Sequence, residues 1–69
     1  MNILLLKGEF RSKAMTQQQV ADGIGISLSR FNAKLNNTRG AEFTLGEVRA
    51  LKRLLQLSPE SVDRIFFDD

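Results

Sequence analysis

The chain has 69 residues, enough for one small domain but close to the lower limit at which a hydrophobic core supports itself. It contains no cysteine and no histidine, so disulfide bonds, thiolate metal sites and the commonest general base are excluded. We therefore predict no enzyme activity, no metal and no cofactor. The formal net charge is only +2, which by itself argues weakly for a nucleic-acid partner.

The charge is unevenly distributed along the chain. Residues 1–41 carry six basic and two acidic side chains, whereas residues 42–69 carry four basic and six acidic ones. No acidic residue lies between Asp22 and Glu42. A basic field of this kind favours DNA binding, because cations that displace counterions from phosphates contribute much of the affinity. A merely solvated charged face is an equally common explanation, so the pattern indicates DNA only together with a motif.

The N-terminal segment predicts an amphipathic helix from about Ile3 to Ala14. Ile3, Leu6, Phe10 and Ala14 recur at three- and four-residue steps, so we expect them to face the core. Gly8 should weaken this helix by about 1 kcal/mol relative to alanine, and close packing against a neighbouring helix would explain it. The apolar run of four residues at its start is too short for a signal peptide or a membrane span, and nothing indicates export.

Residues 16–37 predict two short helices that a tight turn separates. Thr16 and Gln19 have the spacing of a capping box at the start of the first helix. The small side chain of Ala21 would let a second helix approach closely. Gly25 can adopt the left-handed conformation that ends a helix.

The second helix of this pair is expected from about Leu28 to Asn36, after the capping residue Ser27. Leu28, Phe31 and Leu35 form its inward stripe. The residues left outside the stripe are polar or small and include no acid: Ser29, Arg30, Ala33, Asn36 and Asn37. A short, polar, acid-free face of this kind can lie in the major groove of DNA.

The remainder of the chain predicts a loop over Thr38–Phe43, with Gly40 as a turn residue, and two further helices. Thr44 and Glu47 form a second capping box, and Ser58 caps the last helix. The positions expected to face the core are Val48, Leu51, Leu55, Val62, Ile65 and Phe66, with Leu45 and Leu54 at the flank. Helices joined by short loops, without strand-like alternation, predict a single all-α domain.

Residues 16–37 resemble the helix-turn-helix of the phage repressor and Cro family, also called the lambda-repressor-like or Xre type. The matching features are a leading glutamine, a small residue, a turn glycine and three buried positions, here Gln17, Ala21, Gly25, Val20, Ile24 and Phe31. L-K-G-E-F, K-L-N-N and I-F-F are further similar to segments of small Cro-like regulators of temperate phages of Gram-positive bacteria. The resemblance covers nearly all of residues 1–69 and implies a compact five-helix, lambda-repressor-like bundle.

The resemblance implies that the second helix of the motif enters the major groove while residues around it bind phosphates. The candidate base-reading residues are Leu28, Ser29, Arg30, Asn32 and Ala33. The candidate phosphate-binding residues are Gln17, Gln18, Lys34, Asn36, Asn37, Thr38 and Arg39. Glutamines are also simply good helix formers, and asparagines commonly end helices. In many family members the last buried position of this helix corresponds to Lys34, whereas here the apolar residue is Leu35.

These features together favour a sequence-specific regulator of transcription that binds double-stranded operator DNA. The resemblance implies a Cro-like repressor in the choice of a phage between lysis and lysogeny, located in the cytoplasm of the bacterial host. One copy reads few base pairs, so we expect a homodimer on a two-fold symmetric site. The candidate dimer contacts are Phe43, Leu54, Phe67 and the Asp68–Asp69 tail.

A second hypothesis belongs to a different class. The protein would bind the main phage repressor protein and modulate it, because the base-reading set is weak and the net charge is small. The two hypotheses differ in their salt response, since DNA binding weakens steeply with salt and apolar contacts do not. A structural bundle with a fortuitous motif fits the capped turn and the charge distribution less well.

Overall fold

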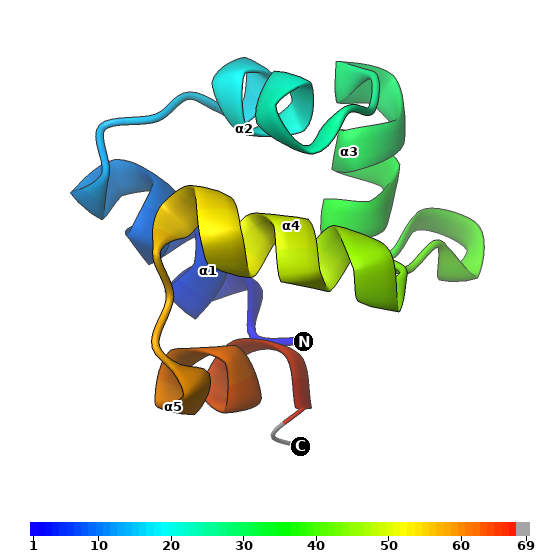
Figure 1. The fold of residues 1–69 in the computed structure, drawn as a ribbon. Coiled ribbons are helices and arrows are strands. Elements are labelled where there is room, and N and C mark those ends of the chain that lie inside the picture. Colours follow the sequence, from blue (N-terminus) through cyan, green and yellow to red (C-terminus); the bar gives the residue numbers. More distant parts are fainter. Residues whose placement is uncertain (68–69) are drawn as a thin grey trace.

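The computed structural model describes residues 1–67 as a bundle of five helices (Figure 1). Their bounds are α1 (Ile3–Ser12), α2 (Gln17–Ile24), α3 (Leu28–Leu35), α4 (Leu45–Leu55) and α5 (Pro59–Val62). A 3-10 turn, η1 (Thr38–Gly40), follows α3, and a π-helical turn, η2 (Asp63–Phe67), continues α5. These described residues include no strand, so the predicted all-α five-helix bundle is confirmed. None of their helices is long and apolar enough to cross a membrane.

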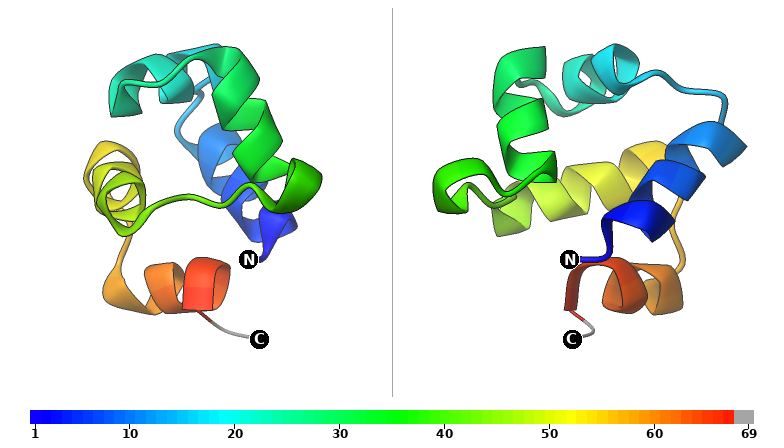
Figure 2. Two further views of the ribbon diagram at one scale, coloured as in Figure 1. Left: turned by 90° about the vertical axis from the view of Figure 1, so that its right-hand side faces the viewer. Right: turned by 180° about the vertical axis from the view of Figure 1, so that it is seen from behind.

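The helices α2 and α3 lie together at one end of the molecule, and α5 lies at the other end (Figure 1). Helices α1 and α4 lie between them on different sides of the core, as the side view shows (Figure 2). The N-terminal segment reaches η2, where the backbone N–H of Asn2 donates to the carbonyl of Ile65 over 2.6 Å. The two ends of the described chain therefore meet far from the turn between α2 and α3.

The core draws side chains from α1, α2, α3, α4, the loop after α4 and η2. Its buried members are Leu6, Phe10, Val20, Ala21, Phe31, Leu35, Leu51, Leu55, Leu57 and Ile65. The predicted inward stripe of α4 is confirmed, and in α3 Phe31 and Leu35 are buried while Leu28 packs against the core from its edge. No buried side-chain nitrogen or oxygen atom of the described residues lacks a hydrogen-bond partner.

All five phenylalanines of the chain form one continuous series of ring contacts. The centroids of Phe10 and Phe31 lie 5.8 Å apart, and those of Phe31 and Phe43 lie 5.6 Å apart. The ring centroid of Phe66 lies 6.4 Å from the centroids of both Phe43 and Phe67. Pairs of this geometry contribute about 0.5–1.5 kcal/mol each beyond the area they bury. The series connects α1, α3, the loop before α4 and η2.

Three helices end in the same way. Ala14, Gly25 and Gln56 each adopt a left-handed conformation, with φ of 55°, 81° and 53°. The backbone N–H of the following residue then donates to the carbonyl five residues earlier, which satisfies an otherwise free group at the helix end. Each of these following residues is apolar and packs against the core: Met15, Ile26 and Leu57. The predicted turn at Gly25 is thereby confirmed.

Two predictions for α1 are wrong. The helix ends at Ser12, and Ala14 is exposed, because the left-handed turn after the helix points its side chain away from the core. A Cβ atom at Gly8 would meet nothing within 4 Å, so close packing does not explain this glycine. The close approach occurs instead at Gly23, where a Cβ atom would lie 2.7 Å from Cδ2 of Leu54. Gly23 therefore lets α2 lie close to α4.

Candidate nucleic-acid interface

Local hydrogen bonds fix both helix starts of the motif, as predicted. The N–H of Gln19 donates to Oγ1 of Thr16 over 3.1 Å, and the N–H of Thr16 donates to Oε1 of Gln19 over 2.8 Å. This capping box begins α2. The N–H of Arg30 donates to Oγ of Ser27 over 3.2 Å and so begins α3. These hydrogen bonds define where α2 and α3 begin, and the end of the turn that connects them.

One face of α3 is buried and the opposite face is open. Phe31 and Leu35 are almost completely buried. Ser29 and Arg30 are exposed, and Ala33, one turn after Ser29, is half-buried. Of the predicted base-reading residues, the remaining two, Leu28 and Asn32, lie at the edge of this face and are also half-buried. The open face therefore centres on Ser29 and Ala33, with Arg30 on one flank.

Lys34 does not lie free on the open face. Its Nζ lies 2.6 Å from both carboxylate oxygens of Glu47, and only 12% and 14% of the two side chains are exposed. Oε1 of Glu47 also accepts the N–H of Thr44 over 2.8 Å, so one carboxylate caps α4 and holds α3. Lys34 would bind phosphate, as predicted, only after leaving this ion pair, because its ammonium group is already paired with Glu47.

The environment of Glu47 keeps this pair charged. Burial raises the pKa of Glu47, whereas hydrogen bonds from Lys34 and Thr44 and the positive charge of Lys34 lower it. The lowering effects prevail, so the pKa of Glu47 lies below its ordinary value of 4.5. The carboxylate is therefore ionised at neutral pH.

The glutamines at the start of α2 have different surroundings. The side-chain amide of Gln18 donates to Oδ1 of Asp22 over 2.8 Å, so it is already partnered by an acid. Gln17 is half-buried and lines a shallow hollow of about 230 Å³ together with Lys7 and Arg11 of α1. The sequence pattern did not single out these two bases as part of the interface. Only the packing of α1 against the start of α2 brings them beside Gln17.

The segment after α3 is open to solvent and unusual in its backbone. Asn36, Asn37, Thr38 and Arg39 are all exposed. Asn37 and Arg39 adopt left-handed conformations with φ of 54° and 53°, and η1 projects from the body beside the end of α3 (Figure 1). For a residue such as arginine this conformation costs about 1–2 kcal/mol. The guanidinium group of Arg39 forms no ion pair with any of residues 1–67.

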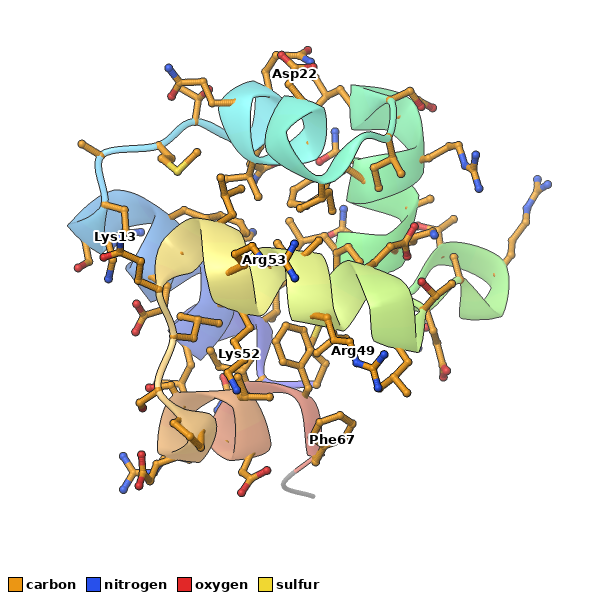
Figure 3. The ribbon with its side chains drawn as sticks, viewed as in Figure 1. Lys13, Asp22, Arg49, Lys52, Arg53 and Phe67 are labelled. Carbon is orange, nitrogen blue, oxygen red and sulfur yellow. The ribbon has the colours of Figure 1, made fainter. Side chains whose placement is uncertain are left out.

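Other bases lie away from α3. Arg49, Lys52 and Arg53 lie along the outer side of α4, and Lys13 lies at the end of α1 (Figure 3). Lys13 forms an ion pair with Glu9 over 3.3 Å. Lys52 and Arg53 belong to the last turn of α4, where cations stabilise the negative end of the helix dipole. Lys13, Lys52 and Arg53 therefore have structural explanations, and none of the four bases lies on α3.

The predicted dimer contacts are only partly available. Phe43 and Leu54 are half-buried and pack against the core, whereas Phe67 is 58% exposed. The Asp68–Asp69 tail lies outside the described residues. Large apolar side chains that the sequence did not single out are exposed near the chain ends: Met1, Leu4 and Leu5. Met1 and Phe67 line the same groove of about 560 Å³, which also reaches Asn36 and Asn37 after α3.

No family model, no curated protein and no solved structure matches this chain. The candidate interface is therefore defined by its residues and their geometry.

Proposed function

We propose that the protein is a sequence-specific regulator of transcription that binds double-stranded DNA, acting as a Cro-like repressor in a phage lysis–lysogeny switch. The observation that carries the proposal is the open face of α3, which is capped, anchored on the core and free of acidic side chains. An α-helix with its side chains is about 10–12 Å in diameter, which suits a major groove about 12 Å wide.

The proposed contacts divide into base reading and phosphate binding. Ser29 and Ala33 face base edges from the centre of the open face, and Ala33 offers a methyl contact to thymine. Arg30 binds guanine or a phosphate, and Asn32 binds adenine from the edge of the face. Phosphates are bound on one side by Gln17 with Lys7 and Arg11, and on the other by residues 36–39.

A homodimer is the proposed binding unit in the bacterial cytoplasm. A two-fold axis would place the α3 helices of the two copies in half-sites about 34 Å apart, one turn of DNA. The exposed apolar side chains near the chain ends, Met1, Leu4, Leu5 and Phe67, supply the contact surface. Met1 and Phe67 share their groove with Asn36 and Asn37 after α3, so this surface adjoins the proposed phosphate contacts, but the groove does not include Ser29, Arg30 or Ala33 of the open face.

The alternative function, modulation of the main phage repressor by direct binding, is favoured by one observation. Leu4 is 79% exposed, and an apolar side chain in that position is typical of protein contacts. A surface of this kind serves equally for a second copy and for a different protein. Salt separates DNA binding from apolar protein binding.

The first experiment is a gel-shift titration of the protein against the intergenic DNA beside its own gene, at two salt concentrations. We expect a discrete shift that survives nonspecific competitor and weakens steeply with salt. Arg30→Ala combined with Asn32→Ala should abolish this shift and leave the fold intact, because neither side chain belongs to the core.

Arg53→Ala is the matched control, since it removes one positive charge from the outer side of α4, and it should bind operator nearly as the wild type does. A smear that competitor removes would contradict the proposal and favour the repressor-binding alternative. A double variant that still protects the same operator would contradict the assignment of the open face.

A further inference from the structure

Helix α3 rests on the core along a narrow line. The helix has 8 residues, and its two almost completely buried side chains, Phe31 and Leu35, lie one above the other at i and i+4. Apolar contacts of this kind are not directional. Leu28 packs against the core beside this line, but none of these apolar contacts by itself fixes the rotation of the helix about its axis.

The Lys34–Glu47 ion pair supplies a directional contact beside that line. Lys34 precedes Leu35 by one residue and so lies about 100° around the helix from it. The ammonium group contacts both carboxylate oxygens at 2.6 Å, and the carboxylate is itself held by the N–H of Thr44. The Lys34–Glu47 pair therefore holds the ammonium group on a fixed carboxylate, and it connects α3 to the start of α4.

We infer that the Lys34–Glu47 pair sets the rotation of α3, which makes Glu47 a positioning residue for base recognition although it lies on α4. The inference rests on the proposed DNA-binding function. A roll of about 20° would move a side-chain tip roughly 6 Å from the helix axis by roughly 2 Å. Hydrogen bonds to bases tolerate only a few tenths of an ångström, so this displacement would change which bases Ser29 and Arg30 reach.

The pair also accounts for the position of Leu35. Lys34 points toward Glu47 of α4, so the last buried apolar residue of α3 is Leu35, one position after Lys34. Ser29 and Ala33 then lie opposite the buried line, and Leu28 turns to the edge of the core. The placement of one lysine thus determines which residues form the open face.

The test uses two variants that break the pair and one control. Glu47→Gln removes the charge but keeps a side-chain oxygen that can accept the N–H of Thr44, because glutamine also serves in a capping box. Lys34→Met removes the ammonium group and keeps the length of the side chain. Glu42→Gln changes the net charge as Glu47→Gln does, at an exposed residue of the loop before α4.

We expect each pair-breaking variant to lower the ratio of operator affinity to unrelated-DNA affinity by about tenfold, while affinity for unrelated DNA stays within about twofold. Glu42→Gln should leave the ratio unchanged. The double variant should lose no more than either single variant, because both changes remove the same contact. In the free protein, the amide NMR signal of Ser29, five residues from Lys34 in the chain, should shift in both variants and not in the control.

Three results would overturn the inference. The first is an unchanged affinity ratio in both variants. The second is an equal loss of operator and unrelated-DNA binding in Lys34→Met, which would make Lys34 a phosphate ligand after all. The third is the absence of NMR shifts on α3 in folded variants. If the wild-type protein binds no DNA, the proposed function fails by itself, and the NMR comparison still decides whether the pair positions α3.

Discussion

The side chains of Lys34 and Glu47 show which part of the site could be predicted at the scale of single residues. Capping interactions involve neighbours three residues apart, so Thr16, Ser27 and Thr44 could be assigned from the sequence alone. The partner of Lys34 lies 13 residues away, in another helix. Two opposite charges at that separation meet only when packing brings their helices together, so the sequence pattern does not contain this contact.

The ion pair makes stability depend on pH in a defined direction. The pKa of Glu47 is lower in the folded state than its ordinary value of 4.5. The stabilisation is therefore fully present above pH 4.5 and is lost as the pH falls through the folded pKa. We expect the difference in unfolding free energy between the wild type and Glu47→Gln, measured with urea, to be constant near neutral pH and to shrink in acid. A difference that grows in acid would contradict this assignment.

Ala14 predicts a second effect confined to one residue. Its φ of 55° costs an alanine about 1–2 kcal/mol, and glycine adopts the same conformation without this cost. After the greater freedom of glycine in the unfolded chain is subtracted, Ala14→Gly should raise the unfolding free energy by about 0.5–1 kcal/mol. Thermal unfolding checks this value. Ser12→Gly, at the last residue of α1, is the control and should lower stability instead.

The helix ends show what could be predicted at the scale of elements. Gly25 could be assigned to a left-handed turn because glycine adopts this conformation freely. Ala14 and Gln56 could not be assigned in this way, since any residue can occupy such a turn when the next residue is anchored. Met15 and Leu57 provide that anchor by packing against the core, and this depends on the tertiary structure.

Two glycines in helices predict opposite outcomes for the same substitution. Gly8→Ala should raise the unfolding free energy by up to about 1 kcal/mol, because the new Cβ meets no atom and the helix gains propensity. Gly23→Ala should raise the unfolding free energy less than Gly8→Ala does, or lower it, because the new Cβ would lie 2.7 Å from Cδ2 of Leu54. Introducing Leu54→Ala should restore the gain from Gly23→Ala, as a double-mutant cycle of urea unfolding would show. Equal gains at the two glycines would contradict the proximity of α2 and α4.

The charge distribution acts at the scale of the whole molecule. The sequence placed most excess base in residues 1–41, but the fold decides which bases can reach the same DNA phosphates. Lys34 is paired with Glu47, whereas Lys7 and Arg11 lie beside Gln17. The net charge of residues 1–41 therefore predicted that one side of the molecule is basic, but it did not identify which basic residues lie there.

This distribution predicts a difference between two arginines. Arg39→Ala, in the projecting η1 turn, should weaken binding to all DNA sequences and reduce the slope of log affinity against log salt by about 1. Arg53→Ala removes the same charge from the outer side of α4 and should change the slope much less (Figure 3). Gel-shift titrations over a series of salt concentrations measure both slopes. Equal slopes for the two variants would contradict the proposed phosphate contact of Arg39.

The proposed homodimer predicts a difference between two exposed leucines. Leu4 lies in the first turn of α1, near the N-terminus, whereas Leu45 lies at the start of α4. Leu4→Lys should weaken self-association measured by sedimentation, because a charge would enter the apolar surface. Leu45→Lys should have little effect. A wild-type protein that remains monomeric at all concentrations and on DNA would contradict the proposal.

The ring series formed by the five phenylalanines also determines how this protein can be observed. The chain contains neither tryptophan nor tyrosine, so the unlabelled protein is almost silent in fluorescence. A tryptophan in place of Phe43 would be the sole strong emitter, in contact with Phe31 of α3 and Phe66 of η2. Its emission would respond to any movement of α3 against the C-terminal turn. An operator titration could then be followed optically, without a dye attached to either molecule.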